Sequence, residues 1–139
     1  MNIILSISGS LIRYRGENDF DILGPNNSTI AAYSYLGYAV ASAQFNKLTN
    51  DKTYYVASSP RAISGEIKIY DISNTFFHLK KSIVGTQIGE YFGYALLVED
   101  FNNDGLPDLA VSAPMHSVNK EYDNGAVYIY LNQGNVSNF

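Results

Sequence analysis

The chain has 139 residues, of which 46% are hydrophobic and 14% aromatic, so it holds enough apolar material for a packed domain and too much for a disordered chain. Its formal net charge of -4 argues against a surface that follows nucleic-acid phosphates, so no nucleic-acid partner is expected. The absence of cysteine excludes disulfides and thiolate metal sites within this stretch. No run approaches the ~20 apolar residues of a membrane-spanning helix.

Three short sequence landmarks occur twice in the same order and indicate an internal repeat. The matching pairs are residues 35–40 and 91–96, residues 56–60 and 110–114, and residues 65–70 and 125–130. The differences in spacing between the pairs are small and fit insertions in loops. The landmarks predict a remnant of a preceding unit at residues 1–30, a first complete unit at 31–85 and a second at 86–139.

Each unit is expected to form β-structure, because side-chain character alternates with period two and no window carries an apolar stripe at helical spacing. In the first unit, residues 77–84 are predicted to form a charged fourth strand, which suits an outer edge. In the second unit, strands are expected at residues 94–98, around Leu109 and Val111, and at residues 125–131. Four short antiparallel strands in about 50 residues are typical of one β-propeller blade.

The predicted fold class is therefore all-β, with propeller blades of four antiparallel strands. Complete propellers have ~4–8 blades, so the chain is a partial propeller of about two blades plus a remnant. A solenoid of β-units is the alternative architecture, and the long four-stranded units favour the propeller.

An acidic loop in the second unit, residues 100–108, has the spacing of a calcium-binding loop. Side-chain oxygens stand at its first, third, fifth and ninth positions, and the main-chain carbonyl of the seventh position is free to join them. Gly105, at the sixth position, permits the positive φ that wraps the backbone around an ion. The predicted Ca²⁺ ligands are Asp100, Asn102, Asp104, Leu106 and Asp108.

The acidic loop differs from an EF-hand, which needs flanking helices and a glutamate at the twelfth position, where this chain has Val111. The alternative is an ordinary Asn-Asp-Gly hairpin turn with solvated carboxylates. Three carboxylates on one turn repel each other without a counter-ion, which favours the calcium site. The equivalent stretch of the first unit, residues 44–52, carries one acid and two lysines, so no metal is expected there.

The landmarks resemble the FG-GAP repeats of integrin α-subunits over nearly the whole chain, most closely from Tyr35 to Gly134. Residues 91–94 are similar to the Phe-Gly element, and residues 111–114 to the Gly-Ala-Pro element with Ser112 in place of glycine. The acidic loop lies between these elements, as the calcium loop of that family does. The resemblance implies middle blades of a seven-bladed propeller in an integrin α-subunit head, which acts in cell adhesion and holds structural Ca²⁺.

The resemblance also implies partners and a location. It implies pairing with an integrin β-subunit and binding of extracellular-matrix or cell-surface protein ligands. It further implies a type I protein at the cell surface, with membrane anchorage only through parts absent from this chain. In the family, aromatic residues beside the Phe-Gly glycine line the central opening and cage a basic residue of the β-subunit, on the face opposite the calcium loops. The matching positions are Tyr35, Tyr38, Tyr91 and Tyr94, with packing inside the blade as their alternative role.

Smaller sequence signals concern glycosylation and the surface. Asn-x-Ser/Thr triplets begin at Asn26, Asn27 and Asn135 and are glycosylation candidates in an exported chain, although such triplets also arise by chance. Arg61 follows Pro60 at a loop tip and is expected to be solvated, with ligand contact as the alternative.

Two other functions stay open on the sequence alone. One is an FG-GAP accessory region of a hydrolase such as a glycosylphosphatidylinositol phospholipase D, and the other is a secreted binding propeller. The chain has no G-x-S-x-G motif, no phosphate-binding loop and no histidine-rich metal cluster, so it is not expected to be an enzyme. His78 and His116 stand in unlike contexts and are expected at the surface.

Overall fold

The computed structural model describes residues 3–7, 10–16, 19–23, 33–47, 52–73, 76–119 and 124–139, the first three ranges by their backbone alone. Every regular element among these residues is a β-strand, which confirms the all-β prediction. These residues form no helix that could span a membrane.

The strands form three antiparallel sheets. The first sheet has the order β1 (Ile3–Ile7), β2 (Ser10–Gly16), β3 (Asp19–Leu23). The second has the order β4 (Val40–Ala43), β5 (Tyr54–Ser59), β6 (Glu66–Ser73), β7 (Phe76–Val84). The third has the order β8 (Leu96–Glu99), β9 (Asp108–Ala113), β10 (Ala126–Tyr130). The second sheet thus has the four strands expected of a blade, and the third has three strands among the residues described.

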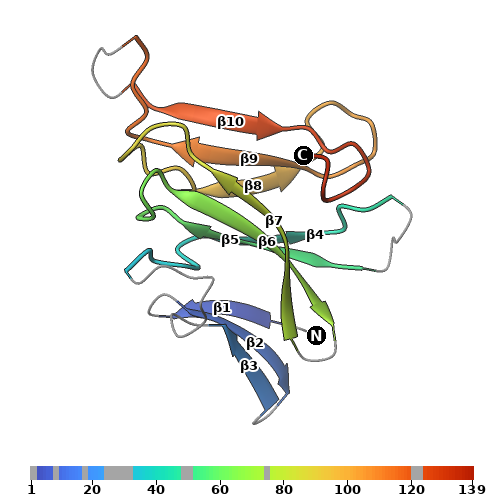
Figure 1. The fold of residues 1–139 in the computed structure, drawn as a ribbon. Helices are drawn as coiled ribbons and strands as arrows, with labels where there is room; N and C mark the ends of the chain where they lie inside the picture. The colour runs from blue at the N-terminus through green and yellow to red at the C-terminus, as the bar shows by residue number, and fades with distance from the viewer. Residues whose placement is uncertain are drawn as a thin grey trace.

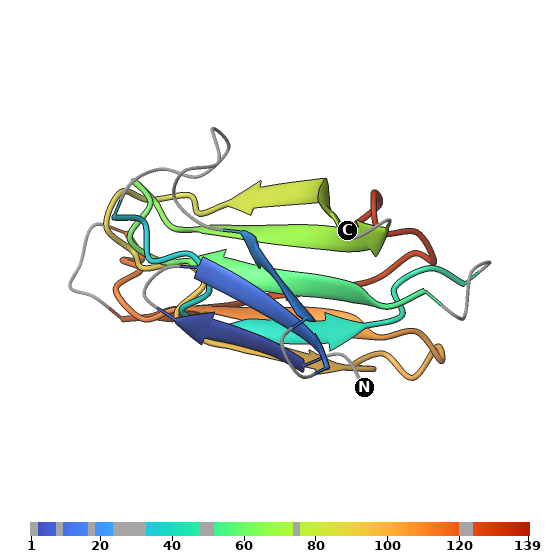
Figure 2. The same cartoon turned by 90° about the horizontal axis from the view of Figure 1, so that it is seen from below.

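The three sheets are stacked in chain order. The second sheet lies between the other two (Figure 1), and the first sheet lies in front of it in the view from below (Figure 2). β4 contacts both β1 and β8, so the leading strands of successive sheets are neighbours, as the innermost strands of propeller blades are. Each sheet falls within one of the three predicted units, 1–30, 31–85 and 86–139, whose exact boundaries stay a prediction.

An apolar core fills the space between the second and third sheets. Most of its buried side chains come from the strands of both sheets, because period-two alternation points every second residue of a strand toward the neighbouring sheet. The segments that flank the strands add Phe45, Phe92 and Val136. The buried members are Phe45, Tyr54, Val56, Ile67, Ile69, Phe92, Leu109, Val111, Ala113 and Val136. Phe92, from the repeated Phe-Gly landmark, packs edge-on against both Tyr128 and Tyr130. The Phe-Gly landmark is therefore a packing element between blades.

Two glycines allow the backbones of the two blades to approach at Phe92. Gly65 has a φ of 85° and forms a parallel bridge with Phe92, and a Cβ there would clash with the Phe92 backbone. Gly93 has a φ of 93°, and a Cβ there would lie 2.9 Å from the Cβ of Ser58. All four glycines of these two landmarks, Gly37, Gly65, Gly93 and Gly125, have positive φ, which favours glycine at each of them.

The strand expected at residues 94–98 is displaced by this turn. The Tyr94 amide donates to the Tyr91 carbonyl at 3.1 Å, so the chain is still turning there and β8 begins only at Leu96. The other expected strands of the second unit and the charged outer strand of the first, β7, are present.

The outward face of the third sheet is apolar and uncovered. Leu97, Val127 and Ile129 are 55%, 65% and 48% exposed. By the repeat spacing, Val127 and Ile129 match Ile67 and Ile69 of the second sheet, which are fully buried against the third. The same blade positions are thus buried where a neighbouring blade follows and open where none does.

We predict that the 139-residue chain alone self-associates or melts without cooperativity, because each exposed isoleucine or valine forgoes about 1.5–3 kcal/mol of burial. Repeat arrays draw their stability from interfaces with neighbours, and ~3 units are usually needed. Analytical ultracentrifugation and calorimetry measure both properties. The double variant Val127→Ser, Ile129→Ser should self-associate less, whereas Ile88→Ser, at an exposed loop residue, should change nothing. A monodisperse parent monomer with a sharp transition would contradict the prediction.

Candidate functional site

The candidate residues lie at opposite ends of the strands. The acidic loop connects β8 to β9, whereas the candidate tyrosines lie on the connections that lead into β4 and β8, at the other end (Figure 1). This separation agrees with the arrangement that the family resemblance implies.

The acidic loop folds its side chains inward onto its own amides. Asp100 accepts hydrogen bonds from the amides of Asp104 at 3.1 Å and Gly105 at 2.8 Å. The Asn102 carbonyl oxygen accepts from the same Asp104 amide at 3.1 Å, and Asp104 accepts from the Leu106 amide at 2.8 Å. Asn103 and Gly105 have positive φ values of 59° and 83°, which give the loop its tight coil. The structure thus brings Asp100, Asn102 and Asp104 together at the surface.

Asp108 stands apart from the other three side chains. It is fully buried, with one oxygen accepting the Asn132 amide at 2.7 Å and the other the Phe101 amide at 3.0 Å. Leu106 is half-buried at the exit of the loop. Asp108 therefore joins both ends of the loop to the segment that leaves β10.

The loop fits a hard cation in its donor chemistry. Ca²⁺ takes oxygen ligands from carboxylates, amides and main-chain carbonyls in flexible geometry, and these are the groups that the loop gathers. In the part of the chain that the structure describes, no three His, Cys, Asp or Glu side chains are grouped closely enough to hold a metal. The fit therefore rests on the Asp100, Asn102 and Asp104 groups together with a main-chain carbonyl, with Asp108 as a less accessible member.

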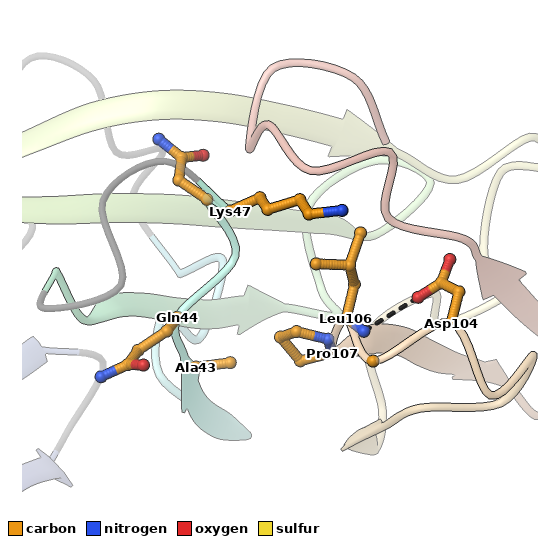
Figure 3. A pocket seen from close by; sticks show the side chains of 8 residues that line it. Ala43, Gln44, Lys47, Asp104, Leu106 and Pro107 are labelled. Carbon is orange, nitrogen blue, oxygen red and sulfur yellow. Dashed lines mark hydrogen bonds between the residues drawn. The ribbon is translucent and has the colours of Figure 1, made fainter.

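A cavity of about 490 Å³ separates the acidic loop from the preceding blade (Figure 3). One wall comes from the end of β4 and the loop after it, and the other from the exit of the acidic loop. The lining residues are Ala43, Gln44, Asn46, Lys47, Asp104, Gly105, Leu106 and Pro107. No sequence pattern indicates this cavity, because its two walls, within residues 43–47 and 104–107, lie about 60 residues apart in the chain.

Three segments, two of which line the cavity, meet in what we call the junction, residues 45–47, 106–108 and 132–136. Asn132 is buried, and its amide nitrogen donates to the carbonyls of Phe45 at 2.9 Å and Pro107 at 3.0 Å. Its oxygen accepts the Gly134 amide at 2.9 Å, and the Gly134 carbonyl accepts the Lys47 amide at 3.1 Å. The junction joins the acidic loop to the preceding blade through one carboxamide.

The four candidate tyrosines are 37% to 49% exposed, so they are surface residues more than packing residues. The rings of Tyr38 and Tyr94 lie 5.2 Å apart and connect the two blades. The Arg61 guanidinium lies 4.8 Å from the centre of the Tyr35 ring. Arg61 is exposed, as expected, yet it already occupies the cation-binding face of Tyr35. Tyr35 and Tyr91 both have positive φ, at 59° and 58°.

A buried polar cluster that sequence reasoning missed lies at the same end as the tyrosines. The carboxylate of Glu90 is fully buried and accepts from the His116 ring at 2.6 Å and the Tyr128 hydroxyl at 3.1 Å. The Gln87 amide also donates to Glu90, and the Gln87 side chain bonds to the main chain of Ser117. The expectation of a surface His116 was wrong, because its ring completes this cluster. No motif marks it, since its members come from two loops and a strand.

Electrostatics favour the ionised form of Glu90. Burial alone would raise the pKa of its carboxyl, but hydrogen bonds from His116, the Gln87 and Thr86 amides and Tyr128 hold that pKa below its ordinary value. The pKa of the Tyr128 hydroxyl is raised, first by burial and then by the Glu90 charge. The Glu90 carboxylate is thus an anion surrounded by hydrogen-bond donors. Its bonds hold the connection before β8 against the β9–β10 loop.

The other candidate residues show no shared site. Asn26 and Asn27 lie outside the described residues, as do residues 48–51 of the first unit's equivalent loop. Asn135 is exposed, and its side-chain oxygen accepts the Ser137 amide at 2.9 Å. His78 is exposed, as expected.

Comparison with known proteins settles the family. The FG-GAP repeat pattern matches residues 92–130. Integrin α-PS3 of Drosophila melanogaster is 46% identical over 103 residues, covering 73% of this chain and 9% of that protein. Integrin α-PS5 of the same organism is 32% identical over 143 residues, covering 94% of this chain and 14% of that protein. Human integrin α-7 is 36% identical over 123 residues, covering 87% of this chain and 10% of that protein.

This chain belongs to the integrin α-subunit family. It spans between 9% and 14% of the length of these three relatives, so it corresponds to one part of such a subunit. The FG-GAP assignment covers the Phe-Gly landmark, the acidic loop and the last strand of the second unit. Because the relatives are integrin α-subunits, the expectation that the chain is not an enzyme is confirmed.

We predict that Glu90→Gln destabilises the intact protein by about 1–3 kcal/mol at neutral pH, because several buried donors lose a charged acceptor. A carboxyl with a lowered pKa in the folded state contributes stability that is present above its unfolded pKa, and this contribution is lost as pH falls through the folded pKa. The parent should therefore lose stability below about pH 4.5 more steeply than the variant. Thermal unfolding against pH measures this difference.

Glu99→Gln is the matched control for Glu90→Gln, because Glu99 is an exposed carboxylate at the end of β8. It should leave both the stability and its acid dependence as in the parent. An acid response of Glu90→Gln equal to that of the parent would show that the Glu90 charge does not stabilise the fold.

Proposed function

We propose that this chain forms part of an integrin α-subunit head and acts in cell adhesion without catalysis. The observation that carries the proposal is its similarity to integrin α-subunits over most of its length. On this proposal the subunit pairs with an integrin β-subunit and binds extracellular-matrix or cell-surface protein ligands. It stands at the cell surface as a type I protein, anchored through parts outside this chain. Its relatives give no support to the hydrolase-accessory or secreted-propeller alternatives.

The blade boundaries belong to the same proposal. Residues 1–30 would be the remnant of a preceding blade, 31–85 a blade without a metal loop, and 86–139 a blade with one, all within a seven-bladed ring. The apolar face left open on the third sheet supports this, because it matches the face that the second sheet buries against its neighbour. Exposed Asn135 would accept an N-linked glycan.

The tyrosine end is the proposed pairing surface. Partly exposed aromatic rings at the start of β4 and β8 offer faces to a cation, worth about 0.5–2 kcal/mol each depending on desolvation. Arg61 already covers the Tyr35 ring, so Tyr38, Tyr91 and Tyr94 are the open members of the set. A basic side chain of the β-subunit would enter over these three.

The acidic loop is the proposed site of a divalent cation, and of Ca²⁺ in particular. Its oxygens converge on the Asp104 amide, and three carboxylates lie within nine residues, Asp100 to Asp108. When bound, the cation would neutralise them and hold the hairpin between β8 and β9 rigid. Its role is structural, at the end of the blade away from the tyrosines.

We predict that the intact protein binds Ca²⁺ in preference to Mg²⁺, because a flexible all-oxygen loop suits the larger ion. Asp104→Ala should weaken binding by more than about tenfold, since charged ligand number sets affinity in such loops. Asn103→Gly is the matched control, because Asn103 has a positive φ and stands at a non-ligand position. Titration calorimetry measures all three proteins. Equal Ca²⁺ affinity in Asp104→Ala and the parent would reduce the loop to an ordinary turn.

We predict that replacing Tyr91 and Tyr94 together with alanine lowers recovery of the αβ heterodimer at the cell surface. The reason is loss of two aromatic faces from the pairing surface. Tyr33→Ala is the control, since Tyr33 is an exposed tyrosine at the same end of the strands. Co-precipitation from the surface fraction, normalised to folded α-subunit, gives the result. Full recovery of the well-folded double variant would remove these residues from the interface.

A further inference from the structure

The acidic loop and the preceding blade are joined by a single buried side chain. Asn132 donates one hydrogen bond to each side of the junction, to Pro107 of the loop and to Phe45 of the blade before it. Its own amide donates to Asp108, the last residue of the loop. The loop, the segment after β10 and the neighbouring blade therefore meet at one carboxamide, which bonds to Pro107 in the lining of the cavity.

The contacts of Asn132 leave little freedom for the loop exit to move alone. Both hydrogens of its amide nitrogen have carbonyl partners, and its oxygen accepts the Gly134 amide. Gly134 in turn accepts the Lys47 amide, and a Cβ at Gly134 would touch the Lys47 side chain at 3.4 Å. A shift of Pro107 or Asp108 would break bonds to buried main-chain groups, which is costly.

We propose that Asn132 is a positioning residue that transmits the state of the acidic loop to the preceding blade. The proposal rests on the proposed cation site in that loop. A bound cation fixes the loop and its exit at Pro107 and Asp108, and Asn132 carries this order to Phe45 and, through Gly134, to Lys47. The blade of residues 31–85 contributes no ligand to this ion, yet it becomes more ordered when the blade of residues 86–139 binds the ion. Asparagine suits the task because it supplies two donors and one acceptor in a short side chain.

Hydrogen exchange of the intact subunit, with and without Ca²⁺, tests the transmission. Peptides across residues 100–108 report occupancy of the loop, and the peptide that contains Lys47 reports the neighbouring blade. In the parent, Ca²⁺ should slow exchange at both places, by about tenfold at Lys47, within the range typical of coupled sites. In Asn132→Ala, loop protection should remain while the effect at Lys47 falls below about twofold. By reciprocity, Ca²⁺ affinity should weaken by the same factor of about five to ten.

Asn46→Ala is the matched control. Asn46 also joins the two blades, because its oxygen accepts the Val136 amide at 2.7 Å, while its nitrogen donates to the Tyr54 hydroxyl of its own blade at 2.7 Å. In the part of the chain that the structure describes, neither bond reaches the acidic loop. This variant should exchange faster at Lys47 both with and without Ca²⁺. The ratio of its two exchange rates should stay near that of the parent. If Asn132→Ala does not fold, Asn132→Leu keeps the volume but lacks both donors, and Ca²⁺ should no longer slow exchange at Lys47 in it.

The outcomes separate this proposal from the proposed cation site. If Ca²⁺ slows exchange in the acidic loop of the parent but not at Lys47, the transmission to the preceding blade is overturned and the proposed cation site stands. If Ca²⁺ still slows exchange at Lys47 in both Asn132 variants, the proposed role of Asn132 is overturned. Absence of Ca²⁺ protection in the loop itself would overturn the cation site, and the transmission with it.

Discussion

A blade of this protein can bury its apolar side chains only against another blade, and the rest of the structure depends on this constraint. Ile67 and Ile69 are buried in one cluster with Phe92, Leu109 and Val111 of the next blade. The side chains at the same positions of the last sheet are exposed, because no blade covers them. The local sequence therefore determines the strands of each sheet, whereas the apolar core forms only between neighbouring blades, as expected of repeat architectures. The close approach at Phe92 also explains the glycines at positions 65 and 93.

The fold was predictable because its signals are local and repeated. Alternation in residues 125–131 and the charged pattern of residues 77–84 mark strands, and the recurring Phe-Gly landmark marks the blade-to-blade contact. The start of β8 was misplaced, because the turn at Tyr91 depends on a left-handed backbone that no alternation reveals. The position of the acidic loop followed from its spacing. The burial of Asp108 did not, because its partner Asn132 lies 24 residues further along the chain.

The buried polar contacts could not be predicted for a different reason. By the repeat spacing, Glu90 corresponds to Ser34, and Asn132 to Ile72. Both side chains thus stand where the repeat is broken, so a search for repetition passes over them. Each works through partners distant in sequence: Glu90 through His116, and Asn132 through Phe45. Such pairs become visible only when the fold has brought them together.

The two breaks in the repeat lie at opposite ends of the strands of the second unit and act on different segments. Glu90 fixes the connection that enters β8, beside the tyrosines, whereas Asn132 fixes the chain that leaves β10, beside the acidic loop. An apolar core alone resists separation of two sheets but tolerates sliding, because dispersion and burial have little direction. The bond from Asn132 to Phe45 fixes the register between the two blades at one end, since a buried donor or acceptor left unpaired is costly. The bonds of Glu90 fix the loops of the second unit to each other at the other end. The tyrosine surface and the acidic loop are therefore held in fixed relation across the same blade, although neither contacts the other.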